Sequence, residues 1–417
     1  MPIPSRTLNR IPNGVWVLGF GSLLMDASSE LIHSLLPLYM VSVLGASVGA
    51  VGVIEGIAEA TAQITKIFSG ALSDRFRRRK FPLVLGYAMA ALTKPLFPLA
   101  SSLGLIVAAR FADRVGKGIR GAPRDALVAD LTPPEMRGAA YGLRQGLDSV
   151  GAFLGPVLAI ACMAWFGGNL KATLWMGVIP ALITVALLIV GLREPVASGS
   201  GQEPLSPRRA VREAPEALLS VGGKPRAYGL PFGLDRLGTR LWLIVLLGSV
   251  FSPARFSEAF LVLRAQNVGL PMGRAPIVMI AMNLVYALGA YPAGAAADRV
   301  SKRTLLILGL LMLIGADLSL AAATGPALVL AGALLWGLHM AMTQGLFSKL
   351  VADACPPDLR GTGFGVFNLF AGLSLLAASS AAGCLWDRVG PSAAFLGGAA
   401  CAAVAALGLL AYRPKTS

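Results

Sequence analysis

Five basic side chains recur along one apolar stretch of the chain at spacings that put them on a single helical face. Residues 103–129 are otherwise rich in Ile, Val, Ala, Leu and Gly. At about 100° per residue, the basic residues and two aspartates among them share an arc of roughly 140°. The members of this stripe are Arg110, Asp113, Arg114, Lys117, Arg120, Arg124 and Asp125. Because unpaired charges are costly in an apolar environment, this face must line a cavity or a helix interface.

Two interpretations of this basic stripe are open. In the first, Arg110, Arg114 and Lys117 line a central cavity and attract an anionic group of a substrate. In the second, the stripe is a structural network in which aspartates neutralise neighbouring cations, and Arg120 and Arg124 belong to a cytoplasmic gate. We expect the substrate role for the first three residues.

Carboxylates form a matching acidic set earlier in the chain. Glu55, Glu59, Gln63 and Lys66 follow i, i+4, i+8, i+11 spacing, which keeps them on one helical face. The preceding apolar stretch adds Asp26, Glu30 and His33. A carboxyl group in a low-dielectric environment binds a proton more readily near neutral pH, so it can load a proton on one side and release it on the other.

We predict proton coupling at Glu30 and Glu59, followed by Asp26 and Glu55. Ion pairs with Lys66, Lys94 or the basic stripe are the alternative, and they would hold the carboxylates ionised. In the second half, Glu258 is either a further titrating site or the partner of Arg255, three residues before it. Further candidates for substrate binding are His33, Gln63, Asn283 and Asn368.

The sequence contains no motif that predicts an enzyme. Gly116-Lys117-Gly118 lacks the spacing of a nucleotide-binding P-loop, and no strand precedes it. The two histidines are isolated, and the four cysteines show no CxxC pair. We therefore expect no catalytic residues, no metal site and no cofactor.

The elements that must hold these residues are membrane-spanning helices. Of 417 residues, 55% are hydrophobic and 14% are charged, whereas soluble chains carry about a quarter charged residues. A helix of ~20 apolar residues crosses the ~30 Å hydrocarbon core of a bilayer. The apolar runs predict twelve spans, at 15–42, 46–72, 81–100, 103–129, 138–166, 170–192, 240–264, 273–297, 303–322, 326–352, 362–386 and 391–412.

The distribution of charge sets the expected topology. The net charge of +15 falls mostly in alternate connections, as the positive-inside rule describes. This pattern predicts an integral protein of a bacterial cytoplasmic (inner) membrane with both termini cytoplasmic, and no nucleic-acid partner. A hydrophilic segment at 193–239 divides the chain into an N-terminal six-helix bundle (1–192) and a C-terminal one (240–417).

The two halves contain related sequences. Residues 128–138 return as 351–361, and residues 70–75 return as 294–299, at offsets of 223 (128 to 351) and 224 (70 to 294). Near-equal offsets in the same order indicate a parallel duplication, which is a transporter design. The cations of the basic stripe have no basic counterparts at that offset, so the repeated scaffold does not require them.

With these repeats, and with residues 70–80 (GALSDRFRRRK) after the second span, the chain resembles the major facilitator superfamily (MFS) over nearly its whole length. The resemblance implies an all-α fold of two pseudo-symmetric six-helix bundles that work by alternating access. It also implies a conformational gate at Asp74 with basic loop residues and repeat-related counterparts. We place Arg75, Arg78, Arg124 and Asp298 with it. Residues 151–156 (GAFLGP) are similar to the glycine–proline element of the drug/metabolite:proton antiporter branch, which favours export.

We therefore expect a monomeric, proton-coupled secondary transporter that exports a small anionic or amphiphilic organic solute. Its partners would be that solute, protons and lipid. One alternative is proton-coupled uptake of an organic anion or metal chelate by symport. Another is a non-transporting membrane sensor or assembly protein, and a third, a membrane enzyme, would require a catalytic set that is not visible.

Overall fold

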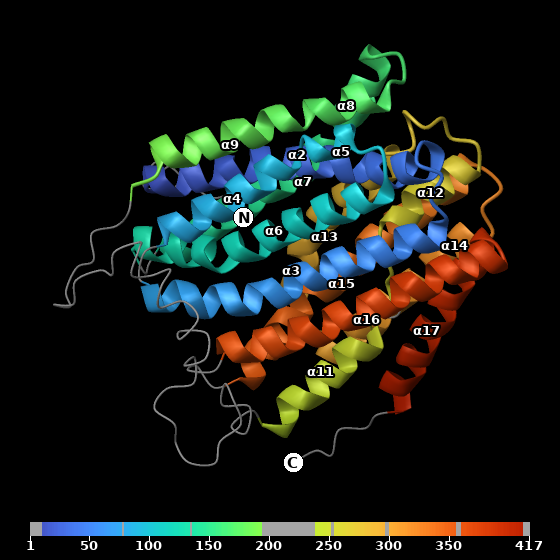
Figure 1. Cartoon of the computed structure of the whole chain (residues 1–417). Helices are drawn as coiled ribbons and strands as arrows, with labels where there is room; N and C mark the ends of the chain where they lie inside the picture. The colour runs from blue at the N-terminus through green and yellow to red at the C-terminus, as the bar shows by residue number, and fades with distance from the viewer. Residues whose placement is uncertain are drawn as a thin grey trace.

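A computed structural model of the chain is built from α-helices (Figure 1) and describes residues 11–76, 79–133, 136–193, 238–251, 254–296, 300–355 and 360–411. The helices of the first half are α2 (Asn13–Ser42), α3 (Val48–Phe76), α4 (Lys80–Thr93), α5 (Leu96–Leu99), α6 (Leu103–Leu131), α7 (Arg137–Trp165), α8 (Leu170–Met176) and α9 (Val178–Gly191). Those of the second half are α11 (Thr239–Phe251), α12 (Ala259–Asn267), α13 (Ile277–Ala296), α14 (Lys302–Ala321), α15 (Pro326–Ala354), α16 (Arg360–Arg388) and α17 (Pro391–Ala411).

Length and composition make these helices membrane spans. Within the described residues, eight helices are long and apolar enough to cross a bilayer. Helices α3 and α6 are not among these eight. Each has 29 residues, which is long enough, but the charged residues of the acidic set and of the basic stripe make them less apolar. The predicted all-α membrane fold is confirmed.

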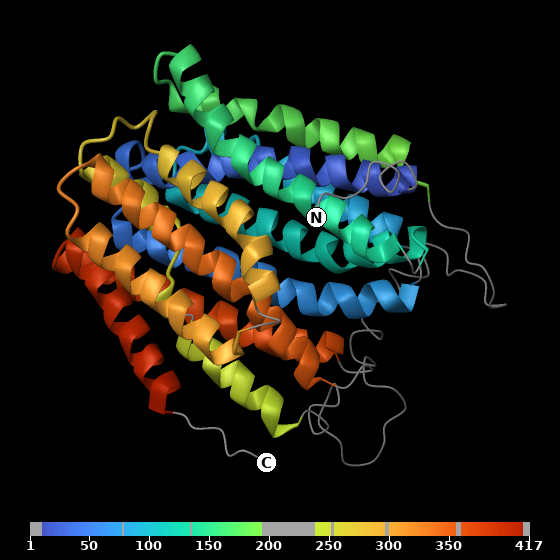
Figure 2. The same ribbon diagram turned by 180° about the vertical axis from the view of Figure 1, so that it is seen from behind.

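The helices pack as two groups that follow the order of the chain. In the first, α2 packs on α7 and α9, while α6 packs on α3 and α4; in the second, α15 packs on α13 and α14, and α14 packs on α17. Figures 1 and 2 show the blue-to-green helices gathered on one side and the yellow-to-red helices on the other. Most of the predicted linker, 194–237, lies outside the described residues.

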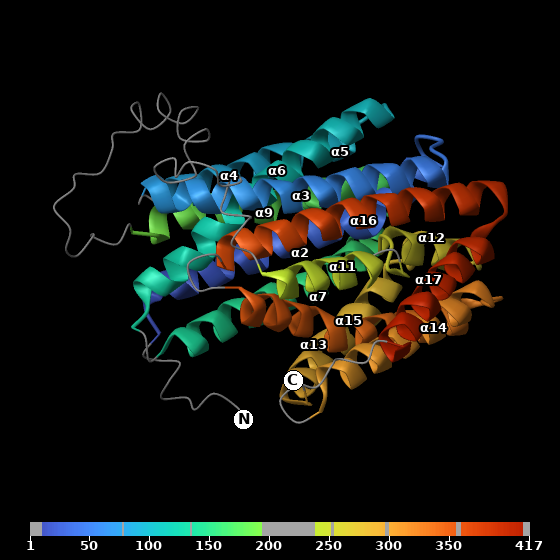
Figure 3. The same cartoon turned by 90° about the horizontal axis from the view of Figure 1, so that it is seen from below.

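Helices α3 and α16 join the two groups, and they run side by side in Figures 1 and 3. Small residues make this approach possible. A Cβ atom at Gly56 would come within 2.8 Å of the Leu376 Cα, and one at Gly383 within 2.6 Å of the Gly49 Cα. The halves are therefore closed against each other at the end where α3 begins, which is opposite the linker end.

Three predicted spans are interrupted, each at a residue that disfavours a continuous helix. The span 81–100 divides into α4 and α5 at Pro95, and the span 170–192 into α8 and α9 at Gly177. The span 240–264 divides more widely, because α11 ends at Phe251 and α12 begins only at Ala259. The sequence there contains Pro253, and a proline cannot donate the backbone hydrogen bond that a helix interior needs.

Candidate functional site

A cavity of about 250 Å³ lies between the two halves. The first half supplies its walls from α2, α3 and α6, and the second half from the break between α11 and α12 and from α12, α13 and α16. Lys117 lies near the middle of α6, so the cavity is near the middle of the bilayer. Its ionisable lining residues are Glu30, His33, Glu55, Glu59, Arg110, Arg114, Lys117, Arg255 and Glu258. The predicted acidic and basic sets therefore meet at one chamber.

Most of the basic stripe on α6 is paired with carboxylates. Arg110 pairs with Glu55 and also contacts His33. Arg114 Nη2 lies 2.9 Å from Glu59 Oε1. Since a buried charge needs a partner to offset its lost hydration, these pairs support the interpretation of the stripe as a structural network.

The aspartates of the stripe behave differently from each other. Asp113 is buried and accepts from Lys94 Nζ at 2.9 Å, while the same ammonium donates to Ser29 Oγ at 3.0 Å. Asp125 is half exposed and lies 3.5 Å from Arg124 Nε. The Lys94–Asp113 pair sits inside the first bundle and is not part of the cavity lining.

Lys117 is the exception among the five cations. Within the described part of the chain it has no hydrogen bond and no carboxylate within 4.0 Å, although it is half-buried and lines the cavity. Arg255, from the second half, also lines this cavity and also has no hydrogen bond and no carboxylate within 4.0 Å among the described residues. Arg114 also keeps two buried nitrogens, Nε and Nη1, that have no hydrogen-bond partner among the residues the structure describes. Lys117 and Arg255 are thus two cations of the chamber that have no carboxylate within 4.0 Å among the described residues.

Two carboxyl groups at the cavity also lack a basic Lys or Arg partner. Glu30 contacts His33 Nδ1 at 3.5 Å, and among the described residues no lysine or arginine forms an ion pair with it. Glu258 and Arg255 do not form the ion pair that their spacing suggested, in the part of the chain described. Glu59, in contrast, is held by Arg114. Of the predicted proton sites, Glu30 and Glu258 are the ones that line the cavity without a lysine or arginine ion-pair partner among the described residues.

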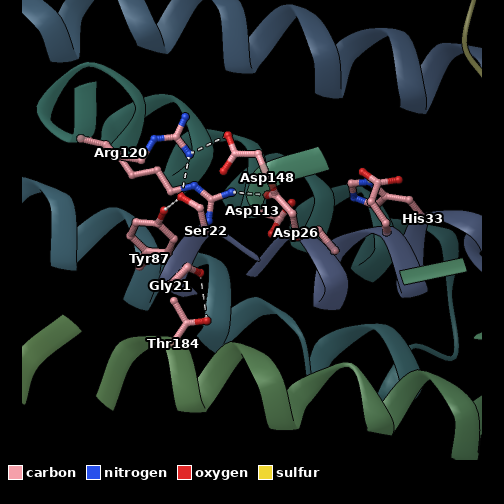
Figure 4. A network of polar contacts seen from close by, with 12 residues as sticks. Gly21, Ser22, Asp26, His33, Tyr87, Asp113, Arg120, Asp148 and Thr184 are labelled. Atoms are coloured by element: carbon pink, nitrogen blue, oxygen red, sulfur yellow. Dashed lines mark hydrogen bonds and ion pairs between the residues drawn. The ribbon is translucent and has the colours of Figure 1, made fainter. Parts of the chain in front are cut away.

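A second polar layer fills the first bundle on the linker side of the cavity, and Figure 4 shows several of its members. Arg120 lies over the ring of Tyr87, 4.4 Å from its centroid, and 3.6 Å from Asp26. Asp148 accepts from Arg144 Nη1 at 2.7 Å and lies 3.6 Å from Arg124. Asp26 is consequently paired and away from the cavity lining, and Arg124 belongs to this network.

The remaining predicted site residues lie outside the cavity lining or outside the described part. Gln63 accepts from Lys66 Nζ at 3.4 Å, and Asn283 donates to the Ala152 carbonyl on α7 at 3.3 Å, so it bridges the two halves. Asn368 lies on α16. The side chains of Asp74 and Arg75 are not described, and Arg78 and Asp298 lie outside the described residues.

Glu258 was among the predicted proton sites, but the place of Arg255 in the cavity did not follow from the sequence, because residues 240–264 were expected to form one continuous helix. The signal that could have identified it is Pro253, two residues before it. Non-helical backbone at membrane depth is tolerated where it lines a cavity. The break between α11 and α12 accordingly brings Arg255, Phe256, Ser257 and Glu258 to the chamber.

Comparison with known proteins places this geometry in context. The family model described as Major Facilitator Superfamily matches residues 18–271 and 259–417. An uncharacterized MFS-type transporter of Methanocaldococcus jannaschii is 29% identical over 409 residues, covering 96% of this chain and 95% of the relative. Over a shorter region, the multidrug resistance protein MdtH of Photorhabdus laumondii is 28% identical over 195 residues, 45% of this chain and 47% of that protein.

A solved structure shows the same fold. A POT family transporter, in complex with 5-aminolevulinic acid, superposes with a TM-score of 0.79 at 15% sequence identity, covering 97% of this chain and 96% of that one. Identity at this level carries the arrangement of the helices and not the cargo.

Proposed function

This chain belongs to the major facilitator superfamily, and on that premise we propose that it couples the movement of protons to the export of a small organic anion. It is an integral membrane transporter of the secondary type, and family and relatives indicate no enzyme activity. We place it as a monomer in a bacterial inner membrane, with the basic linker and both termini in the cytoplasm.

The observation that carries the anionic substrate is the pair of unneutralised cations, one from each half. Lys117 on α6 and Arg255 beside α12 line the same chamber without a carboxylate partner among the described residues. An anion that contacts both cations gains more when the two halves close around it than when they are apart. Such a ligand therefore favours the occluded state, which is what substrate-driven alternating access requires.

Glu30 and Glu258 support the proton coupling. Both carboxyl groups face the cavity without a basic ion-pair partner in the described residues, so their charge can change without breaking a structural pair. Glu55 and Glu59 differ, because losing their charge would strand Arg110 and Arg114. We assign proton exchange to Glu30 and Glu258, and structural roles to the other two.

Export is supported by the similarity to a multidrug resistance protein and by the glycine–proline element of residues 151–156. The two halves contact each other closely at the end opposite the linker. For a cytoplasmic linker, an exporter would load its cargo in a state that is closed at that end. Asp74, Arg75, Arg78 and Asp298 would form the cytoplasmic gate that closes when this state converts.

Uptake by symport is the second candidate, and the electrostatics of the cavity favours it. A proton on Glu30 removes a negative charge from the wall that an anion must approach, so proton and anion bind more tightly together than apart. Opposite signs of proton movement separate the two candidates. Export by exchange moves protons against the cargo, and symport moves them with it.

Transport in proteoliposomes tests the proposal. Small organic anions that raise the melting temperature of the purified protein would be assayed for flux with an imposed pH gradient of each sign. Lys117→Gln and Arg255→Gln should each weaken binding about tenfold or more, since a hydrogen bond to a charged group contributes about 1.5–3 kcal/mol. The matched control is Lys171→Gln, an exposed lysine on α8 outside the cavity.

Glu30→Gln should abolish proton-driven flux while leaving substrate exchange across the membrane intact. The anionic-substrate proposal fails if both cation variants carry every identified cargo with unchanged affinity. The coupling proposal fails separately if the pH gradient does not drive flux in the unaltered protein.

A further inference from the structure

Asp317 is a carboxyl group sealed inside the second bundle. It lies on α14, its exposed fraction is 0%, and neither carboxylate oxygen has a hydrogen-bond partner within the described structure. It is neither a cavity residue nor a repeat of the acidic set in the first half. An ionised carboxylate buried without a donor is strongly unfavourable, so a group in this position takes up a proton and becomes neutral.

The charged groups on the surrounding elements do not offset this burial. Arg264, on α12, donates to the carbonyl oxygens of Leu320, Ala321 and Ala323, at the C-terminal end of α14. His339, on α15, bonds through Nδ1 to the Gly309 carbonyl at 2.8 Å.

Two further charged groups, Arg255 and Glu258, precede α12. Among the described residues, Arg255, Arg264 and His339 form no ion pair with the Asp317 carboxylate, and Glu258 forms no hydrogen bond with it. Residues 391–411 of α17 contain no charged side chain.

One aromatic ring connects this buried group to the transport cavity. Phe256 lines the cavity, and its Cε1 lies 2.9 Å from the position of a Cβ atom built on Gly398. Asp317 Oδ2 lies 2.7 Å from the same position, so the ring and the carboxyl group both pack against Gly398. The ring also packs on Trp336, with centroids 5.6 Å apart, and the buried Trp336 Nε1 likewise has no hydrogen-bond partner in the described part of the chain.

We propose that Asp317 is a proton-binding site of the C-terminal half, occupied in this conformation and opened to the cavity by displacement of Phe256. The site is separate from Glu30 and Glu258, whose carboxyl groups already face the chamber. Its proton exchanges with the cavity when the aromatic ring moves, because that ring lines the cavity and lies with the carboxyl group against Gly398. The proposal concerns this group alone and holds whichever direction the cargo moves.

Infrared spectroscopy of the full chain in lipid nanodiscs tests the occupancy. A protonated carboxyl group has a C=O stretching band that an ionised carboxylate lacks, and the band should be present at neutral pH and lost in Asp317→Asn. The amide is a neutral isostere, so a protonated aspartate predicts a folded variant. Asp130→Asn, which changes an exposed aspartate of α6, should leave the band in place.

Gly398→Ala provides an independent assignment if the first variant does not fold. The added methyl group would crowd Oδ2, so the band should shift in frequency. A band that keeps its full intensity in Asp317→Asn, or that is absent from the unaltered protein, overturns the proposal. So does a band that does not move in Gly398→Ala.

Deuterium exchange tests the path. After transfer to heavy water the band should shift slowly in the unaltered protein, and on the order of tenfold faster in Phe256→Ala. A tenfold faster exchange requires a lower barrier to opening, and the packing free energy lost when a buried phenylalanine is truncated is larger than that reduction. Phe256→Leu is the milder substitute. Equal exchange rates would show that the ring does not close the site. None of these measurements requires transport, so they can fail or succeed independently of the proposed function.

Discussion

A contact between the two halves should set the balance between the conformations of the transporter. Asp387, at the end of α16, accepts from the backbone N–H groups of Val48 and Gly49, at 3.0 and 2.8 Å. These are the first residues of α3, so the carboxylate of one half caps a helix of the other. The first N–H groups of a helix have no partner within it, and a negative charge there is favourable.

We predict that Asp387→Ala weakens closure at this end of the molecule. Replacing a capping side chain with alanine costs about 0.5–2 kcal/mol, and Ser47 Oγ still accepts from the Ala50 N–H at 3.1 Å. A loss of one to two kcal/mol changes a two-state ratio by roughly 5–30-fold. If about nine tenths of the molecules adopt this conformation, a tenfold change leaves about half of them in it.

Distance measurements between spin labels would detect the change. Labels on cysteines introduced at Ser101 and Val389 report the separation of the two halves at this end, in a background with the four native cysteines replaced. Both positions are exposed.

The short-distance population should fall in Asp387→Ala. It should not fall in Asp130→Ala, because that carboxylate pairs with Arg79 at 2.8 Å inside the first half. An unchanged distribution in the first variant, or an equal change in both, would refute the capping argument.

Two further predictions concern packing. Lys94→Met should lower the free energy of unfolding by about 3–5 kcal/mol because it strands Asp113, whereas the double variant with Asp113→Leu should recover much of that loss, as measured by thermal unfolding. Gly52→Ala should shift spin-label distances toward the open form, because its methyl group would meet the Ser379 carbonyl on α16; Gly146→Ala, where nothing lies within 4 Å, should not.

The fold was predictable from the sequence because its main signals are local. Apolar runs long enough to span a bilayer define helices independently of their neighbours, and the repeats at near-equal offsets define two related halves. The interruption before α12 was not predicted, because hydropathy does not distinguish a continuous helix from two apolar segments around Pro253. Glu258 was among the predicted sites, but Arg255, which this break also brings to the cavity, was absent from them.

The predicted charges are at the cavity, but their partners could not be read from one sequence. Helical spacing puts Arg110, Arg114 and Lys117 on one face, and gives no information on which carboxylate of another helix reaches each of them. That choice depends on where α3 and α6 cross. The structure gives Glu55 to Arg110 and Glu59 to Arg114, and only then does Lys117 stand out.

The asymmetry between the halves suggests how the charges divide the work. Paired cations on α6 fasten α2, α3 and α6 to one another, so that the first half can move as one body without exposing an unpaired charge. In the second half, Arg255 lies between α11 and α12, outside any helix. Its backbone can therefore adjust to a bound ligand more easily than the helices of the first half can. On the proposed function, a cargo that binds Lys117 and Arg255 together would join the fixed half to the adjustable one, and its charge, more than its shape, would decide when the halves close.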